Sequence, residues 1–104
     1  MSVRINSANI QKEVIESDVP VILEFYSDSC IPCKALSPVL GDIEDEYEGR
    51  VKVCKVNVNI DRDLAEKYEV MAAPTMLFFE NGKEIDRVKG IASKDDILDR
   101  FGGL

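Results

Sequence analysis

The chain has 104 residues, of which 45% are hydrophobic and 32% charged, and this balance fits one globular domain over residues 1–104. Its formal net charge of −7 repels phosphate backbones and anionic lipids, so we expect no nucleic-acid or membrane partner. The N-terminus lacks the features of a signal peptide, and no apolar run is long enough to span a bilayer. We therefore expect a monomer in the cytoplasm, where thiols are kept reduced.

The first quarter of the chain predicts a short strand, a helix and a buried strand. Residues 3–5 suit the short strand, and Ser7 can cap a helix that ends near Ser17. Residues 21–26 form a nearly continuous apolar run. Such a run is typical of a strand that other elements cover on both faces.

The middle of the chain continues this alternation. Apolar residues from Leu36 to Tyr47 form a helical stripe, and Gly49 is a suitable stop for that helix. Residues 51–58 predict a second buried strand, after which Asp61 can cap a short helix. Helical connections between these strands imply parallel pairing.

The last third predicts a hairpin and a closing helix. Residues 75–80 and 83–89 suit two strands joined by Asn81-Gly82, a strong signal for a two-residue turn. Ser93 can cap the last helix. The predicted order is β-α-β-α-β-α-β-β-α, which is an α/β fold with a central mixed sheet and helices on both of its faces.

The cysteines are the candidate reactive residues of the chain. The chain has three, Cys30, Cys33 and Cys54, and an odd number does not suit a framework of structural disulfides. A bridge between Cys30 and Cys33 would stabilise the fold by about 2 kcal/mol, against about 3 kcal/mol for a 15-residue loop. Cys30 falls at the start of a helix, where free N–H groups and the helix dipole favour a thiolate. Cys33 returns to the same side and can attack a mixed disulfide formed at Cys30.

Metal ligation is the alternative interpretation of a Cys-x-x-Cys motif. The chain has no histidine and only one further cysteine, so zinc and iron–sulfur sites lack ligands. The sequence therefore favours a redox dithiol and predicts no metal. Cys54 lies in a predicted buried strand and is interpreted as a small core residue.

A set of short segments lies in a fixed order along nearly the whole chain: residues 23–26, residues 30–34 (Cys-Ile-Pro-Cys-Lys), Pro38, residues 73–75, Asn81-Gly82 and Gly90. With these segments the chain resembles the thioredoxin family from end to end. The resemblance implies a thioredoxin-like fold and a protein-disulfide reductase that needs no cofactor beyond the Cys30–Cys33 disulfide. It also implies protein disulfides as substrates and a thioredoxin-reductase-like protein as electron donor.

The resemblance further implies catalytic roles. Cys30 corresponds to the attacking cysteine and Cys33 to the buried resolving cysteine. Glu24 corresponds to a buried acid, usually Asp, that exchanges a proton with the resolving cysteine, and Lys55 to a lysine near it. From the residues alone, Glu24 could also be an exposed or ion-paired strand residue, and Lys55 only its structural partner.

A substrate groove beside the dithiol is implied in the same way. Pro74 corresponds to a cis-proline that faces the dithiol and exposes the backbone before it to an extended substrate. The residues expected to contact the substrate are Ser29, Ile31, Pro32, Ala73, Pro74 and Gly90.

The chain departs from the family's usual pattern around the first cysteine. Ile31 stands where Gly is usual, and Ser29 and Tyr26 stand where Trp is usual. These changes alter the surface that a reductase or target must touch. Two other functions therefore stay open: an electron carrier dedicated to one reductase or metabolic enzyme, and a binding module with little turnover. The presence of both cysteines, Glu24 and Pro74 argues against the binding module.

Overall fold

A five-stranded mixed sheet forms the centre of the fold, in the order β1-β3-β2-β4-β5. The central strand β2 (Val21–Tyr26) runs parallel to β3 (Lys52–Asn57) and antiparallel to β4 (Thr75–Glu80). The edges are β1 (Val3–Arg4), parallel to β3, and β5 (Lys83–Lys89), antiparallel to β4. The α/β architecture expected from the sequence is confirmed.

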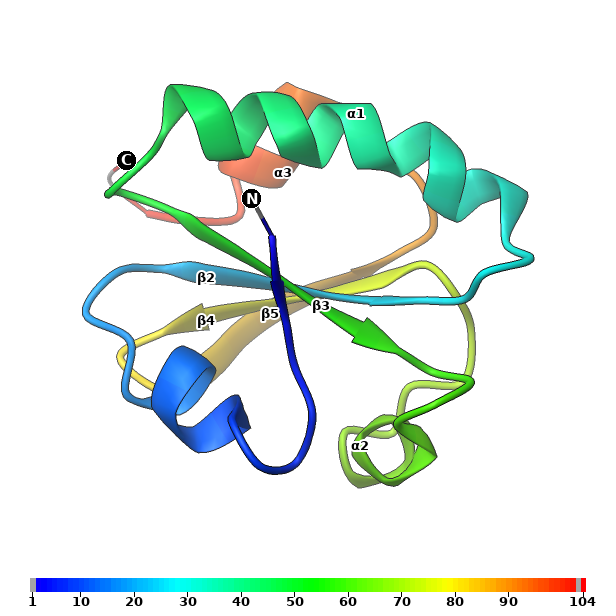
Figure 1. Cartoon of the computed structure of the whole chain (residues 1–104). Coiled ribbons are helices and arrows are strands. Elements are labelled where there is room, and N and C mark those ends of the chain that lie inside the picture. Colours follow the sequence, from blue (N-terminus) through cyan, green and yellow to red (C-terminus); the bar gives the residue numbers. More distant parts are fainter. Residues whose placement is uncertain (1, 103) are drawn as a thin grey trace.

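Helices cover both faces of this sheet, as Figure 1 shows. Helices α1 (Ile31–Glu46) and α3 (Lys94–Leu98) lie on one face, whereas α2 (Arg62–Lys67) and the short π-helix η1 (Gln11–Ile15) lie on the other. The computed structural model describes residues 2–102 and 104. Within those residues, no helix is long and apolar enough to cross a membrane.

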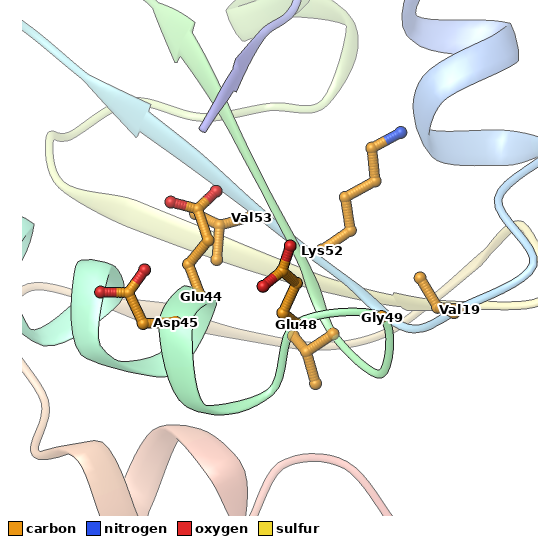
Figure 2. Close-up of a pocket in the computed structure, with 8 residues that line it drawn as sticks. Val19, Glu44, Asp45, Glu48, Gly49, Lys52 and Val53 are labelled. Atoms are coloured by element: carbon orange, nitrogen blue, oxygen red, sulfur yellow. The ribbon is translucent and has the colours of Figure 1, made fainter. Parts of the chain in front are cut away.

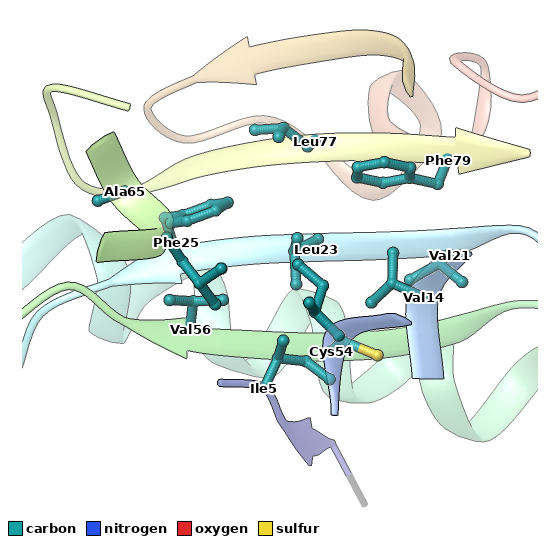
Figure 3. Packing of buried hydrophobic residues seen from close by; sticks show 12 residues of the cluster. Ile5, Val14, Val21, Leu23, Phe25, Cys54, Val56, Ala65, Leu77 and Phe79 are labelled. Atoms are coloured by element: carbon teal, nitrogen blue, oxygen red, sulfur yellow. The ribbon is translucent and has the colours of Figure 1, made fainter. Parts of the chain in front are cut away.

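Alternate side chains of β2 supply two separate cores. Val21, Leu23 and Phe25 belong to the cluster on the side of η1 and α2 (Figure 3). Ile22 belongs to the cluster under α1 and α3. Side chains two residues apart in a strand point to the same face, so Glu24 lies on the face that α1 covers. The strand thereby directs one carboxyl group toward the helix that carries the cysteines.

The expectation that Ser7 caps the first helix is wrong. The N-cap residue of η1 is Ile10, and no side chain makes a capping hydrogen bond there. Asn6 acts in the turn before the helix, where its Oδ1 accepts the backbone N–H groups of Ala8 at 2.8 Å and Asn9 at 3.2 Å. Ser7 donates its hydroxyl to the Asp63 carboxylate at 2.7 Å instead. Serine is a good capping residue, but the sequence alone could not show that this hydroxyl has a tertiary partner. The helix is also shorter than expected, since η1 ends at residue 15.

The ends of the other helices can be compared with the sequence expectations in the same way. Asp61 occupies the N-cap position of α2, but its side chain makes no capping hydrogen bond. Helix α1 ends at Glu46, and Gly49 lies in the turn that follows, with a φ of +80°. The cap of α3 is confirmed, because the Ser93 hydroxyl accepts the N–H of Asp96 at 3.2 Å.

The β4–β5 hairpin turns at Asn81-Gly82, as expected. Both residues have positive φ values, 53° for Asn81 and 77° for Gly82. A Cβ atom at Gly82 would also lie 2.7 Å from the carbonyl oxygen of Ile15. Glycine is therefore required here by the backbone conformation and by the close approach of η1.

Candidate active site

The two cysteines of the Cys-x-x-Cys motif meet at the N-terminus of α1, where they form a disulfide with 5.2 Å between their Cα atoms. Cys30 is the N-cap residue, and its sulfur accepts the backbone N–H of Cys33 at 3.1 Å. Pro32 lies in the first turn, where its missing N–H breaks no helical hydrogen bond. Cys30 is partly exposed, whereas Cys33 is only 5% exposed. Of the two sulfurs, Cys30 is therefore the one that a partner can reach.

The loop before β4 lies against this disulfide. The Ala73–Pro74 peptide bond is cis, as the resemblance implies. The carbonyl oxygen of Ala73 lies 3.4 Å from the Cys30 sulfur. On the other side, the carbonyl of Pro74 accepts the N–H of Gly90 at 2.8 Å. The loop that contains the buried Pro74 thus connects the disulfide to the end of β5.

Beneath the disulfide is a small cavity of about 200 Å³. It contains Glu24, Cys33 and Lys55, and its other lining residues are Tyr26, Ser27, Asp28, Lys34 and Ser37. Glu24 is 2% exposed, so the alternative of an exposed strand residue is wrong. Burial raises the pKa of Glu24, and the charge of Lys55, which is in register with it on β3, partly lowers it. Burial therefore favours the protonated form of Glu24, while the charge of Lys55 favours the ionised form, and a carboxyl group can act as acceptor or donor of a proton.

The remaining residues expected to contact a substrate surround the disulfide at the same end of the sheet. Ser29, Ile31 and Pro32 are exposed next to Cys30, and the Ile31 side chain is 77% exposed. Gly90 has a φ of +86°, and a Cβ atom there would meet nothing within 4 Å. Its backbone conformation, rather than lack of space, is therefore the reason for glycine at this position.

Comparison with known proteins gives the family. Residues 1–101 match the sequence model of the family described as Thioredoxin. The chain belongs to the thioredoxin family. It is 35% identical over 99 residues to the thioredoxin of Rickettsia felis, covering 95% of this chain and 94% of that protein. Thioredoxin 1 of Nostoc sp. is 35% identical over 91 residues, with 88% and 85% covered, and the thioredoxin of Porphyra purpurea is 36% identical over 94 residues, with 90% and 88% covered.

Membership of the thioredoxin family makes this chain a thiol–disulfide oxidoreductase. Family members are disulfide reductases whose redox-active disulfide is the only redox group they need, and thioredoxin reductase typically reduces them. In residues 2–102 and 104, no group of three or more His, Cys, Asp or Glu side chains is arranged to hold a metal ion.

Three exposed apolar residues of this chain were missed by the sequence interpretation. They are Ile60, Met71 and Ile91, and the exposed fractions of their side chains are 60%, 95% and 57%. Each lies in a segment that follows or precedes a strand at the dithiol end of the sheet. A single apolar residue in a loop does not indicate a functional surface. The sequence could have marked these three residues only through their positions next to strand ends on the dithiol side of the sheet.

A second cavity, of about 360 Å³, lies at the opposite end of the sheet (Figure 2). It contains no thiol, and Figure 2 shows carboxylates around its rim. Lys52 points away to η1, where its amino group binds the Glu13 carboxylate at 2.8 Å and the Glu13 carbonyl at 2.9 Å. The residues that line this cavity are Val19, Glu44, Asp45, Glu48, Gly49, Val51, Lys52 and Val53.

The third cysteine, Cys54, is a core residue, as expected. It is 0% exposed, and Figure 3 shows its sulfur among the apolar side chains of the cluster next to η1 and α2. Burial raises the pKa of its thiol to about 12. Because the thiolate is the reactive form, Cys54 takes no part in exchange at neutral pH.

Proposed function

We propose that the protein reduces protein disulfides, with Cys30 as the nucleophile and Cys33 as the resolving cysteine. The observation that carries this proposal is the position of the Cys30 sulfur, which is partly exposed and accepts the Cys33 N–H at 3.1 Å. In the reduced protein, this N–H and the N-terminus of α1 stabilise a thiolate on Cys30. Cys33 is 5% exposed, so it attacks only the disulfide formed on Cys30.

Glu24 and Lys55 serve the second step. The Cys30 thiolate first attacks the target disulfide, forms a mixed disulfide and releases one target thiolate. Cys33 then transfers its proton to Glu24 within their shared cavity and attacks the Cys30 sulfur. This forms the Cys30–Cys33 disulfide and releases the second target thiolate, so two electrons pass from the dithiol to the target. The charge of Lys55 keeps enough of Glu24 ionised to accept the proton.

The substrate binds as an extended segment along the loop that contains Ala73. The backbone of this residue, beside the Cys30 sulfur, pairs with the backbone of the target. The residues that flank the target cysteine then contact the exposed side chains of Ser29, Ile31 and Pro32. Pro74 and the backbone of Gly90 complete the groove from the loop before β4 and the end of β5. A thioredoxin-reductase-like protein supplies the electrons to the monomer in the cytoplasm, where thiols are kept reduced.

Reduction of insulin driven by dithiothreitol tests this function. We expect turnover by the unaltered protein, none by Cys30→Ser, and a reversible two-electron couple on equilibration with glutathione. Cys54→Ala is the matched control, since it removes a thiol outside the site and should leave turnover unchanged. Absence of both turnover and a two-electron couple would contradict the proposal.

The exposed Ile31 favours a second candidate, an electron carrier dedicated to one reductase or metabolic enzyme. Its side chain is 77% exposed between the two cysteines, so any partner that reaches Cys30 must contact it. Reduction by dithiothreitol together with failure to accept electrons from a standard thioredoxin reductase would support this candidate. Ile31→Gly and Ser29→Trp should then restore acceptance, and unimpaired acceptance by the unaltered chain would remove the candidate.

A further inference from the structure

A second carboxyl group, that of Asp28, lines the cavity that contains Glu24 and Cys33, and the steps above do not use it. The two carboxyl groups occupy different depths. Glu24 is 2% exposed, whereas Asp28 is an exposed residue. One acid therefore lies at the floor of the cavity and the other at its mouth.

Asp28 is held at this mouth by Asn57, the last residue of β3. The Asn57 side chain is 3% exposed, and its Nδ2 lies 3.3 Å from each oxygen of the Asp28 carboxylate. Its Oδ1 accepts the backbone N–H of Asn59 at 2.9 Å. Because both ends of the amide are engaged, its orientation is fixed. A buried, oriented donor thus positions a carboxylate that would otherwise extend into water.

The position of Asp28 matters because Glu24 exchanges its proton through the cavity. Burial raises the pKa of Glu24, and the groups that line the same cavity are the candidates to receive its proton. Lysine ammonium groups offer no acceptor, and a neutral phenol is a weak base. Asp28 is therefore the remaining acceptor among the titratable groups of the cavity, which are Glu24, Tyr26, Asp28, Cys33, Lys34 and Lys55.

We propose that Asp28 is the outer proton acceptor of this cavity and that Asn57 is the residue that positions it. The inference rests on the proposed function. During resolution, Cys33 gives its proton to Glu24, the new thiolate forms the bond to Cys30, and the bond from Cys30 to the target breaks. The proton then passes from Glu24 to Asp28 and on to water, where the departing target thiolate can take it up.

The test uses reduced protein mixed with dithiobis(nitrobenzoate), which releases a coloured thiolate at each step. Attack by Cys30 releases the first equivalent, and resolution by Cys33 releases the second. Cys54 does not interfere, because burial raises the pKa of its thiol to about 12. The two phases therefore measure nucleophilic attack and resolution separately in one experiment.

We expect Asp28→Asn to slow the second phase by roughly five- to tenfold, below the 10²–10⁴-fold typical of a group that contacts the reacting atom. The slowing should be largest at acidic pH and fade as the pH rises, because hydroxide then accepts the proton directly. Asn57→Ala should have the same effect, and the double variant should be no slower than Asp28→Asn. Asp28→Glu should restore the rate.

Asp18→Asn is the matched control, because it removes the same charge from an exposed position before β2, at the opposite end of the sheet. An unchanged second phase in Asp28→Asn at every pH would overturn the inference, as would equal slowing of both phases. If Asn57→Ala does not fold, Asp28→Asn still tests the inference, because Asp28 is exposed and its substitution should leave the fold intact. No release by the unaltered protein would overturn the proposed function instead.

Discussion

The two ends of the central strands differ in what their cavities contain. The cavity at the dithiol end measures about 200 Å³ and holds a buried acid next to a cysteine, whereas the one at the opposite end measures about 360 Å³ and holds no thiol. The larger cavity is therefore not the reactive one. The chemistry lies where a helix N-terminus, a buried carboxyl group and an accessible sulfur meet.

The largest expected effect separates the exposed sulfur from the buried one. Cys30→Ser should lower the rate of insulin reduction by roughly 10³-fold or more, because it removes the nucleophile itself. Cys54→Ser should leave the rate unchanged, since Cys54 is 0% exposed. It should nonetheless lower the midpoint of urea unfolding, because it buries a hydroxyl among apolar side chains. Loss of turnover in Cys54→Ser at unchanged stability would contradict the assignment of Cys54 to the core and of Cys30 to catalysis.

Phe78→Ala tests whether the far end of the sheet serves stability alone. Phe78 is 0% exposed and packs against Phe101 with 5.2 Å between the ring centroids. Removing its ring should lower the free energy of unfolding by about 3–5 kcal/mol, measured by urea denaturation. The folded fraction should keep the rate of the unaltered protein, because Phe78 pairs with Ile22, near the start of β2. A changed rate in fully folded protein would show that the ends are coupled.

Glu24→Gln should separate activity from stability at the dithiol end. The resolving step should slow by roughly tenfold or more, because an amide cannot accept the Cys33 proton. The folded protein holds the Glu24 proton to a higher pH than the unfolded chain, whose pKa is 4.5, so stability falls as the pH rises above that value. The variant should therefore be more stable than the unaltered protein near neutral pH, with a difference that disappears in acid. Thermal unfolding at several pH values measures this, and equal stability at every pH would contradict it.

The smallest effects compare two lysines of β3. Lys55→Met removes the charge that lowers the pKa of Glu24, so the pH profile of the resolving step should move to higher pH. Lys52→Met, at the opposite end of the strand, breaks the 2.8 Å ion pair with Glu13 and should lower stability slightly without moving the profile. Stopped-flow kinetics over a pH series distinguish the two. If Lys52→Met also shifts the pH profile of the resolving step, the effect of a lysine would not depend on the end of β3 at which it lies.

Most of the fold was predictable because its signals are local. The apolar run of β2 and the Asn81-Gly82 turn each depend on adjacent residues, and both are confirmed. The start of the first helix was not predictable, because η1 follows Ile10 without a side-chain cap, whereas Ser7 is of a type that favours capping. The Ser7 hydroxyl binds the Asp63 carboxylate of α2 instead, a tertiary contact that no local pattern predicts.

The site was predictable where a motif marks it and hidden where it depends on tertiary contacts. The cysteine motif and Pro74 can be recognised in the sequence, and Glu24 is conspicuous as the one charge in an apolar run. The contact between Asp28 and Asn57 joins residues 29 positions apart, and no motif in the sequence links the two. The pairing therefore emerges only when the end of β3 is placed beside the loop before α1.

The edges of the sheet have a consequence for strand pairing between molecules. Strand β1 has two residues, and β5 carries charged side chains along its exposed side, including the Glu84–Arg87 ion pair at 2.6 Å. Short and charged edges discourage the addition of a foreign strand. Pairing of copies of this chain through either edge is therefore disfavoured, so the sheet ends with the five strands that one chain supplies.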